Sequence, residues 1–580
     1  MPRLTAIALL TATSCAAHHP FPLREPMWKD TDLQSVSLPC RPDPTPKEPK
    51  RQTCAPEEYV SPFFWDQIDN LAFARMSRGF ALHVSGEAVN VNSMDEVPDS
   101  AWFTNLPRGT ATTKDTTDDG APGACKPEDI LDAADKVPDG AWVIDHGKDN
   151  GSTLGFRVVV PGKGQYMLKA NDESQPERAS AASVIGAAFF EALGFNTTCE
   201  QVVVIRKGQL KLSPGLKSVD NAGVTRVFDD TALDKVLKST TQVPGGFVRM
   251  QASKWLAGLP IGPFTYVGIR PDDPNDVIDH ADRRELRGSR VLAGWIDHWD
   301  AREQNSMDVW VADDPHDKRS SPGHVVHYFI DTSDTLGGVT GPPGLQARLG
   351  RSYELDFPDI FRSLLTLGLD ERPWDRARPA QDHPKFGFYT ALEFDPAHYK
   401  PFYPNPAFLR MTERDGAWMA RLIARFSVAD IRRIVAWGKF STPSDADYIV
   451  KVLLDRQRQI LVRFLRALSP LGEVRNAAPD RICATDFARL RELSPAAMFT
   501  YKITARAGGK QVALQPEVGA EGELCFRTHP IVEGTHLDGD AAQRVTIEIT
   551  NGSKAAPLRI HAYDLGARGM HVVGLTRPEN

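Results

Sequence analysis

The stretch Asp297-His-Trp-Asp-Ala-Arg-Glu-Gln-Asn305 decides the fold that we expect for this chain. It follows residues 282–296, whose apolar positions have the spacing of an amphipathic helix. Beyond it, the apolar run of residues 325–330 predicts a short buried strand, which leads into Asp331. The sequence therefore predicts a helix, a polar loop and a strand, with acidic side chains held where these elements end.

The region upstream has the patterns of a β-rich unit that carries a lysine. Residues 156–160 and 165–169 flank the turn Pro-Gly-Lys-Gly164 and predict a hairpin whose second strand ends at Lys169. Three more elements are expected after it: an alanine-rich helix over residues 177–193 ended by Gly194, and strands over residues 201–205 and 247–256. Past residue 272 the chain becomes mainly helical, with helices expected over residues 414–426, 428–437 and 445–468.

These motifs carry a resemblance to a known family. His298-x-Asp300-x4-Asn305 is similar to the catalytic loop of kinases, and Ile330-Asp331-Thr-Ser-Asp-Thr-Leu-Gly337 resembles their metal-binding segment. The resemblance is closest to the phosphatidylinositol-kinase and HipA-type branch and covers roughly residues 140–470. It implies an α+β fold with a two-lobed kinase-like body, in which a β-rich N-lobe precedes a helical C-lobe.

The resemblance also implies a role for each motif residue with ATP and Mg²⁺ (or Mn²⁺). Phosphoryl transfer depends on positioning and on neutralising charge. Lys169 would hold the α- and β-phosphates, and Gly151 belongs to a glycine series that would cover them. Asp331 would bind the metal, and Asn305 would bind a second metal ion or brace the loop. Asp300 would orient the attacking hydroxyl and accept its proton.

Each assignment has a plainer alternative. An Asp with an Asn five residues later occurs by chance in a chain of this length, and then marks a solvated helix end followed by a loop. Lys169 is then an ordinary strand lysine. Asp297 and Asp308 are expected to be structural partners, and His298 to be a packed residue that positions the loop.

Three departures from the kinase pattern bear on activity. Ser183 stands where the helix after Lys169 should offer a glutamate, and Glu177 lies nearly two turns earlier. Thr332 replaces the glycine that usually follows the metal-binding aspartate, which is tolerable where the backbone needs no positive φ. An exported protein also meets little ATP.

Two functions therefore stay open at this point. The first is an envelope-located, atypical ATP-dependent phosphotransferase whose acceptor is a protein, a lipid headgroup, a sugar or a small molecule. The second is a catalytically inactive, pseudokinase-like interaction protein of the envelope. A third class, a metal hydrolase built on His324, His327 and His298, is disfavoured, because strand positions three apart point to opposite faces.

Composition excludes one class of partner. The chain has 580 residues, 41% hydrophobic and 25% charged, as is usual for a globular protein. Its formal net charge is -7, whereas a nucleic-acid binder needs a basic face to neutralise phosphates. We expect no nucleic-acid partner.

The first residues resemble a lipoprotein export signal. Arg3 provides the charge, Leu4 to Leu10 form a short apolar segment, and Cys15 stands at the position that becomes lipidated. The alternative is the unprocessed N-terminus of a cytosolic protein. We expect an exported protein of the cell envelope, either lipid-anchored at Cys15 or periplasmic or extracellular.

The remaining cysteines fit an oxidising compartment. Six are left after Cys15, an even number that suits three disulfides. The expected pairs are Cys40 with Cys54, Cys483 with Cys525, and then Cys125 with Cys199. Unrelated buried thiols are the alternative.

The expected organisation runs from an arm to a sandwich. Its units are a signal segment (1–15), an extended linker (16–57), an N-terminal extension (58–138), the N-lobe (139–270), the C-lobe (271–475) and a C-terminal β-sandwich (480–580). Within the extension, residues 58–82 are expected to be helical and residues 87–105 to form a strand and loop. The sandwich rests on alternating runs such as Val545-Thr-Ile-Glu-Ile549 and gives no catalytic signal.

Overall fold

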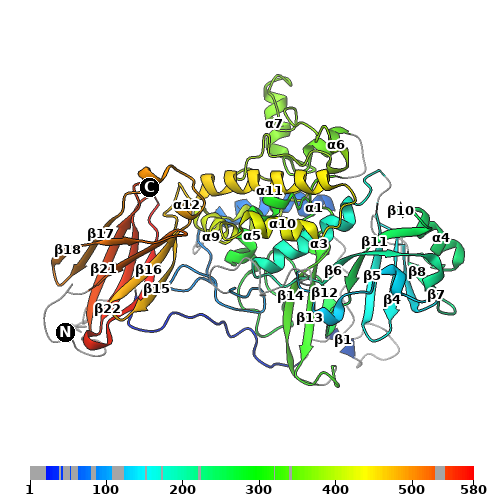
Figure 1. Ribbon diagram of the computed structural model, residues 1–580, viewed down its shortest axis with the longest axis horizontal. Helices are drawn as coiled ribbons and strands as arrows, with labels where there is room; N and C mark the ends of the chain where they lie inside the picture. Colours follow the sequence, from blue (N-terminus) through cyan, green and yellow to red (C-terminus); the bar gives the residue numbers. More distant parts are fainter. Residues whose placement is uncertain are drawn as a thin grey trace, which may run out of the picture.

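The computed structural model describes residues 21–37, 41–42, 52–53, 63–79, 86–106, 123–149, 153–171, 174–219, 224–318, 321–338, 343–528 and 542–579. Helices and strands both occur along these ranges, and the strands form several separate sheets. The predicted α+β class is therefore confirmed. Figure 1 shows the C-terminal strands (orange and red) at one end of the molecule, helices in the middle, and the strands of residues 142–254 at the other end.

A seven-stranded, mostly antiparallel sheet holds the predicted lysine. Its order is β10-β11-β5-β4-β3-β7, and β6 also pairs with β11. The strands are β3 (Trp142–Lys148), β4 (Gly155–Val160), β5 (Gly164–Ala170), β6 (Glu200–Ile205), β7 (Leu210–Leu212), β10 (Thr241–Val243) and β11 (Phe247–Lys254). The predicted hairpin is confirmed as β4 and β5, whose turn contains Gly162 and Gly164 at positive φ.

The two faces of this sheet differ in character. One face carries apolar side chains such as Leu168 and Met250, which pack with helix α4 (Asp230–Lys238). The other face meets helix α3 (Arg178–Ala192), which contacts β6 and β11. Alanines along α3 let it lie close to the sheet, and all but one of its residues are buried. The helix ends near Gly194, whose φ of 101° places its backbone against Thr104.

Helices in the middle of the molecule form the largest apolar core. They are α5 (Arg284–Ile296), α8 (Pro406–Leu409), α9 (Glu413–Ile423), α10 (Val428–Ala436) and α11 (Pro443–Phe464). Trp295 and Trp418 are buried at their centre. The predicted helices at these positions are confirmed, including the capping box formed by Ser427 and Asp430. None of the helices in the described ranges combines the length and apolar character needed to cross a bilayer.

A three-stranded sheet has the order β12-β13-β14, and its last two strands follow the polar loop of residues 297–305. Its strands are β12 (Leu259–Gly262), β13 (Ser306–Ala312) and β14 (Gly323–Phe329). The predicted strand at residues 325–330 corresponds to β14. Strand β13 was not predicted, because Asp308 interrupts its apolar run. The Asp308 side chain is buried and pairs with Arg270 and His327.

Two antiparallel sheets form the C-terminal part. One contains β15 (Leu471–Ala478), β16 (Arg481–Asp486), β19 (Pro516–Val518) and β20 (Glu523–Arg527). The other contains β17 (Lys502–Ala507), β18 (Lys510–Leu514), β21 (Gln543–Thr550), β22 (Leu558–Asp564) and β23 (Met570–Thr576). Both sheets contribute to one apolar core that includes Ile482, Phe526 and Ile547, and the short helix α12 (Phe487–Leu490) borders the first sheet.

The N-terminal segments lie against the rest of the chain. Residues 63–79 are helical, as predicted, in α1 (Phe63–Ile68), a π-helical turn (Asp69–Phe73) and α2 (Ala74–Gly79). Residues 87–105 form turns and isolated bridges, such as Phe103 with Phe195, so the predicted strand there is wrong. Its apolar side chains pack individually into the helical core. The short pairs β1 (Arg41–Pro42) with β2 (Gln52–Thr53) and β8 (Lys217–Val219) with β9 (Thr225–Val227) complete the described strands.

Helices α6 (Pro343–Arg348) and α7 (Phe357–Leu365) project from the helical part (Figure 1). Apolar side chains on α7 and on the turn after it face solvent. Those more than half exposed are Ile360, Phe361, Leu364, Leu365, Leu367 and Leu369. This projection is therefore unusually apolar for a surface segment.

Two of the three expected disulfides are present in the described ranges, Cys125–Cys199 and Cys483–Cys525. Cys40 and Cys54, expected to form the third, lie outside them, as does Cys15. The two bonds indicate an oxidising, extracytoplasmic location.

Candidate functional site

Lys169 and Asp331 form an ion pair between the large sheet and the end of β14. The Lys169 Nζ lies 2.8 Å from Asp331 Oδ2. Burial alone would lower the pKa of Lys169, but the Asp331 carboxylate and the field of Glu200 raise it above its ordinary value. Burial opposes ionisation of Asp331 as well, yet Lys169 and a hydrogen bond from Ser333 hold its pKa well below the usual range. Both groups are therefore charged at neutral pH.

Asp300 and Asn305 form a second pair in the central polar loop. The Asn305 side-chain amide donates to the Asp300 backbone carbonyl at 2.7 Å and to its Oδ2 at 3.0 Å. Arg302 Nε lies 2.7 Å from the other carboxylate oxygen. Burial, opposed by Arg302 and reinforced by Asp334, raises the pKa of Asp300 to about 7. A carboxylate with such a pKa is suited to exchange a proton near neutral pH.

The two pairs are connected through backbone and side-chain contacts. The Ile330 N–H donates to the Asn305 carbonyl at 3.0 Å, so Asn305 and Asp331 belong to adjoining backbone segments. Asp334 accepts from the Asp300 N–H at 2.8 Å and lies 2.8 Å from His298 Nδ1. His298 is buried, so it holds the loop in place, as predicted for a packed positioning residue.

The segment after Asp331 rests on helix α3. Thr332 donates to the Ser183 carbonyl at 2.9 Å, and Arg178 donates to the Ser333 carbonyl at 2.7 Å. A Cβ on Gly186 would lie 2.7 Å from the Thr332 side chain, so glycine permits this close approach. The left-handed residue is Asp331 itself, with φ of 53°, and not Thr332. The missing glycine at position 332 therefore places no strain on the backbone.

Although Ser183 stands where a glutamate was expected, another acidic residue, Glu200, lies beside it. The Ser183 hydroxyl donates to Glu200 Oε2 at 3.0 Å, and Thr198 donates to Glu200 Oε1 at 2.7 Å. Glu200 begins β6 and is buried. Glu177, by contrast, lies at the N-terminus of α3 and pairs with Lys385 at 3.2 Å. Glu200 was not singled out from the sequence, because only the sheet brings it to Ser183.

A second lysine lies near the ion pair. Lys148, at the end of β3, donates to the Thr153 carbonyl at 2.7 Å. Burial and the field of Lys169 lower its pKa to about 8, while Asp331 acts in the opposite direction. Gly151, which the resemblance assigns to phosphate binding, lies outside the described residues. The end of β3 nevertheless adds positive charge beside Asp331.

The donor atoms around Asp331 suit a hard divalent cation. Carboxylate and amide oxygens are the protein ligands that Mg²⁺ prefers. Asp331 offers a carboxylate that is 34% exposed. Asn305 directs its amide nitrogen toward Asp300. Its amide oxygen receives no hydrogen bond from the described residues. The resemblance assigns the metal to Asp331 and Asn305, and each offers an oxygen atom of the kind that Mg²⁺ prefers.

The histidine-based alternative is not supported. His324 and His327 alternate in burial along β14 and so lie on opposite faces, as predicted. His327 is buried, stacks on Trp102 and lies 2.6 Å from Asp308. Across the described ranges, one set of His, Cys, Asp and Glu side chains is close enough to hold a metal: Cys483, Glu523 and Cys525. Two of these are joined as a disulfide, so this set is not a metal site.

A separate cavity of about 340 Å³ borders the central loop at Asp297. Tyr399, Arg351 and Arg456 also line it, and none of the motif residues Lys169, Asp300, Asn305 or Asp331 does. Burial, opposed by Arg456 and Arg351, raises the pKa of Asp297. The balanced charges fit the structural role predicted for this residue.

The chain was also compared with known proteins. It matches no protein-family model, no curated protein and no solved structure.

Proposed function

We propose that this chain is an atypical ATP-dependent phosphotransferase of the cell envelope. The observation that carries the proposal is the Lys169–Asp331 ion pair at 2.8 Å, adjoining the Asp300–Asn305 pair. Kinases use a strand lysine, a metal-binding aspartate, and an aspartate and asparagine of one loop for this chemistry. In support, the Ile330 N–H donates to the Asn305 carbonyl, so the two pairs lie on adjoining segments.

The proposed architecture is a two-lobed kinase-like body followed by a C-terminal β-sandwich. The large sheet with α3 corresponds to the N-lobe, and the helices around α5 and α11 correspond to the C-lobe. In support, Lys169 lies on the third strand of the run β3-β4-β5, which is also its place in protein kinases. The common core of the two C-terminal sheets supports the sandwich.

Each residue has a defined task in the proposed reaction. Lys169 holds the α- and β-phosphates, with Lys148 adding positive charge nearby. Asp331 and Asn305 would hold Mg²⁺ or Mn²⁺ through oxygen atoms, and that metal would supply neutralisation of phosphate charge. Asp300 orients the acceptor hydroxyl and takes its proton, for which a pKa of about 7 is suitable.

The proposed setting is the outer side of a membrane. The two disulfides support export, and the proposed lipidation of Cys15 would anchor the chain. The acceptor is then a protein, a lipid headgroup, a sugar or a small molecule within reach of that surface.

The test is nucleotide-dependent thermal stability of the chain, with and without ATP and Mg²⁺. At about 100 times its Kd, a ligand that binds only the folded state adds about 2.7 kcal/mol to the free energy of unfolding. We expect a metal-dependent rise in Tm that disappears in Asp331→Asn. Asp447→Asn, which alters an exposed helix carboxylate paired with Arg432, is the matched control and should keep the shift.

A well-folded wild-type protein with no shift in any nucleotide or metal would contradict the proposal. The chain would then be better described as an interaction protein with a pseudokinase body. A shift that persists in Asp331→Asn would contradict the residue assignment alone.

A further inference from the structure

We propose that Glu200 of β6 is the carboxylate that positions Lys169, in place of an acidic residue on α3. The inference rests on the proposed function, in which Lys169 binds phosphates. A strand lysine in that role needs a buried acid behind it, because its long side chain otherwise samples many rotamers. Helix α3 offers Ser183 at the point where such an acid was expected.

The register of the sheet places Lys169 and Glu200 on one face. Lys169 of β5 lies opposite Gln251 of β11, and Glu200 of β6 lies opposite Ser253 of the same strand. Cross-strand partners share a face, and so do residues two apart along a strand. The face that carries these four side chains is the one covered by α3, because Ser183 of that helix donates to Glu200.

Hydrogen bonds fix the Glu200 carboxylate from three elements. Ser183 donates from α3, Thr198 from the turn before β6, and Gln251 from β11 at 3.1 Å. Gln251 is also the cross-strand neighbour of Lys169, so it lies between Glu200 and Lys169 on the sheet. Burial raises the pKa of Glu200, whereas hydrogen bonds from Ser253, Thr198 and Ser183 and the charge of Lys169 oppose that rise. Glu200 is thus held by its neighbours on the face that carries Lys169.

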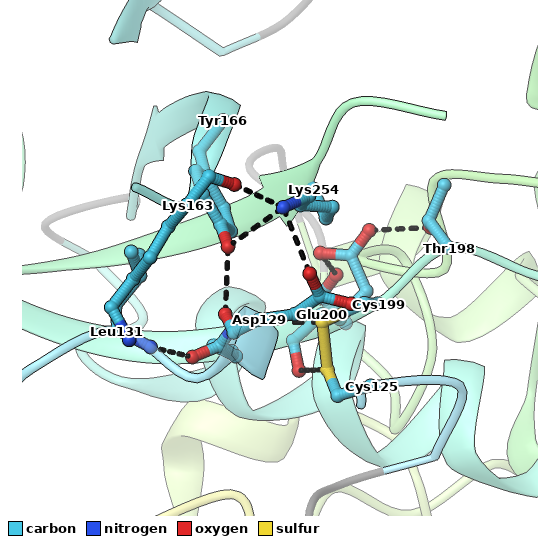
Figure 2. The surroundings of a disulfide bond; sticks show 11 residues. Cys125, Asp129, Leu131, Lys163, Tyr166, Thr198, Cys199, Glu200 and Lys254 are labelled. Atoms are coloured by element: carbon cyan, nitrogen blue, oxygen red, sulfur yellow. Dashed lines mark hydrogen bonds and ion pairs between the residues drawn. A yellow bond between two sulfur atoms is a disulfide. The ribbon is translucent and has the colours of Figure 1, made fainter. Parts of the chain in front are cut away.

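A covalent bond holds the start of β6 as well. Cys199, the residue before Glu200, is joined to Cys125 (Figure 2). Figure 2 also shows the Thr198 side chain directed toward the Glu200 carboxylate. The segment after Cys125 is tied to the same strands, because Asp129 accepts from Tyr166 at 2.7 Å through its carbonyl and pairs with Lys254 at 2.9 Å. The backbone that presents Glu200 therefore has little freedom to move.

The test measures how readily a reactive ATP analogue modifies Lys169. The probe is an acyl phosphate of ATP, which transfers its acyl group to a lysine amine beside the phosphates and releases ATP. Acylation of Lys169 is quantified by mass spectrometry in the presence of Mg²⁺. Loss of Glu200 also lowers the pKa of the Lys169 amine, so the rate with the ATP probe is divided by the rate with acetic anhydride, which cancels that change. Glu200→Gln should lower this ratio by about tenfold, because the amine is no longer held beside the phosphates. Glu128→Gln, which changes an exposed acid near the same disulfide, should leave the ratio unchanged.

The decisive variant is the double substitution Ser183→Glu with Glu200→Ala. It transfers the carboxylate across the 3.0 Å hydrogen bond to the expected helix position. Recovery of the ratio of the two Lys169 acylation rates toward its wild-type value is expected, and a merely structural role for Glu200 would not produce it. If Glu200→Gln does not fold, Thr198→Val removes one hydrogen bond and keeps the charge; a smaller loss, of about threefold, is then expected.

Two outcomes overturn this inference. Folded Glu200→Gln that keeps the wild-type ratio is one, and a double variant no better than Glu200→Ala alone is the other. Failure of the proposed function is distinguishable, because wild-type Lys169 would then show neither probe labelling nor a Tm shift with ATP. In that case acetic anhydride replaces the probe, and an unchanged acetylation of Lys169 in Glu200→Gln would still reject the inference.

Discussion

The sheet that carries Lys169 and the C-terminal sheet of β21 and β22 use their buried faces in opposite ways. Beneath α3, the first sheet places Lys169, Arg249, Gln251 and Glu200 on one face. In the second, β21 points Val545, Ile547 and Ile549 inward, each fully buried. Both sheets are mainly antiparallel and both are covered, so their topology does not explain the difference.

Under the proposed function, apolar residues of the C-terminal core stabilise the fold, whereas polar residues under α3 serve the reaction. Burying a polar group costs free energy unless it is hydrogen bonded, and apolar packing would serve stability as well. The polar side chains under α3 nevertheless have hydrogen-bond partners. Arg249, for example, donates to the Ser180 hydroxyl and to the Gly438 and Lys439 carbonyls. A face built at this cost is where changes should affect function, whereas changes in the C-terminal core should affect stability alone.

The largest expected effect is on transfer itself. If Asp300 accepts the proton as proposed, Asp300→Asn should lower the rate of phosphate release from ATP by roughly 10²–10⁴-fold. The wild-type rate should rise with pH through about 7, where the raised pKa of Asp300 lets it ionise. Initial rates measured between pH 5.5 and 8.5 check both points. A pH profile unchanged in Asp300→Asn would argue that another group accepts the proton.

The next effect belongs to the C-terminal core. Ile547→Ala should lower the free energy of unfolding of that region by about 2–5 kcal/mol, since the residue is fully buried in an apolar cluster. Thr546→Ala, at the neighbouring and more exposed position, should change it by only about 0.5 kcal/mol. Thermal denaturation followed by circular dichroism measures both. Nucleotide binding should be the same in both variants, and its loss would break the comparison.

The two disulfides give a matched pair of intermediate size. Removing a native disulfide typically lowers stability by about 2–5 kcal/mol, and the loops here span 74 and 42 residues. Cys125→Ser with Cys199→Ser should also weaken nucleotide binding, because Glu200 follows Cys199. Cys483→Ser with Cys525→Ser should leave binding unchanged. Calorimetric titration with Mg·ATP measures the affinity of each double variant. An equal loss of affinity in both would show that nucleotide binding simply follows stability.

The smallest effect is a pH dependence in the C-terminal sheets. Burial, together with Arg544 and Arg559, lowers the pKa of His561 from 6.5 to about 4. The unfolded chain therefore binds a proton first, so this contribution to stability is complete above pH 6.5 and is lost as the pH falls to about 4. We expect a loss on the order of 1–3 kcal/mol. His561→Gln should flatten this part of the Tm-against-pH curve, and an unchanged slope would assign it to other groups.

Much of the backbone followed from local patterns. Strong periodicity and clear caps mark the hairpin that carries Lys169, the helix after it and the long helices of the middle region. Their bounds therefore depend on a few local residues. Strand β13 and residues 87–105 were misjudged for opposite reasons. Asp308 hides a buried strand, because its partners Arg270 and His327 are remote in sequence. Residues 87–105 alternate like a strand, but their apolar side chains pack one by one into the helical core.

The candidate site divides in the same way. Asp300, Asn305 and Asp331 follow a spacing that sequence can show, since one loop and one strand end present them. Glu200 could not be found from sequence, because it opens an ordinary-looking strand and reaches Ser183 only through the packing of α3 on the sheet. Asp334 was missed although it lies three residues after Asp331; its contacts with His298 and Asp300 depend on how the loop folds back.

The apolar projection formed by α7 and the turn after it has a practical consequence for handling the protein. Leu367 and Leu369 are 88% and 89% exposed, on a segment that stands clear of the body. In a concentrated sample such tips adsorb to plastic and air–water interfaces and lead molecules to associate. Mild detergent during purification, or serine at these two positions, would remove that source of loss before any assay is attempted.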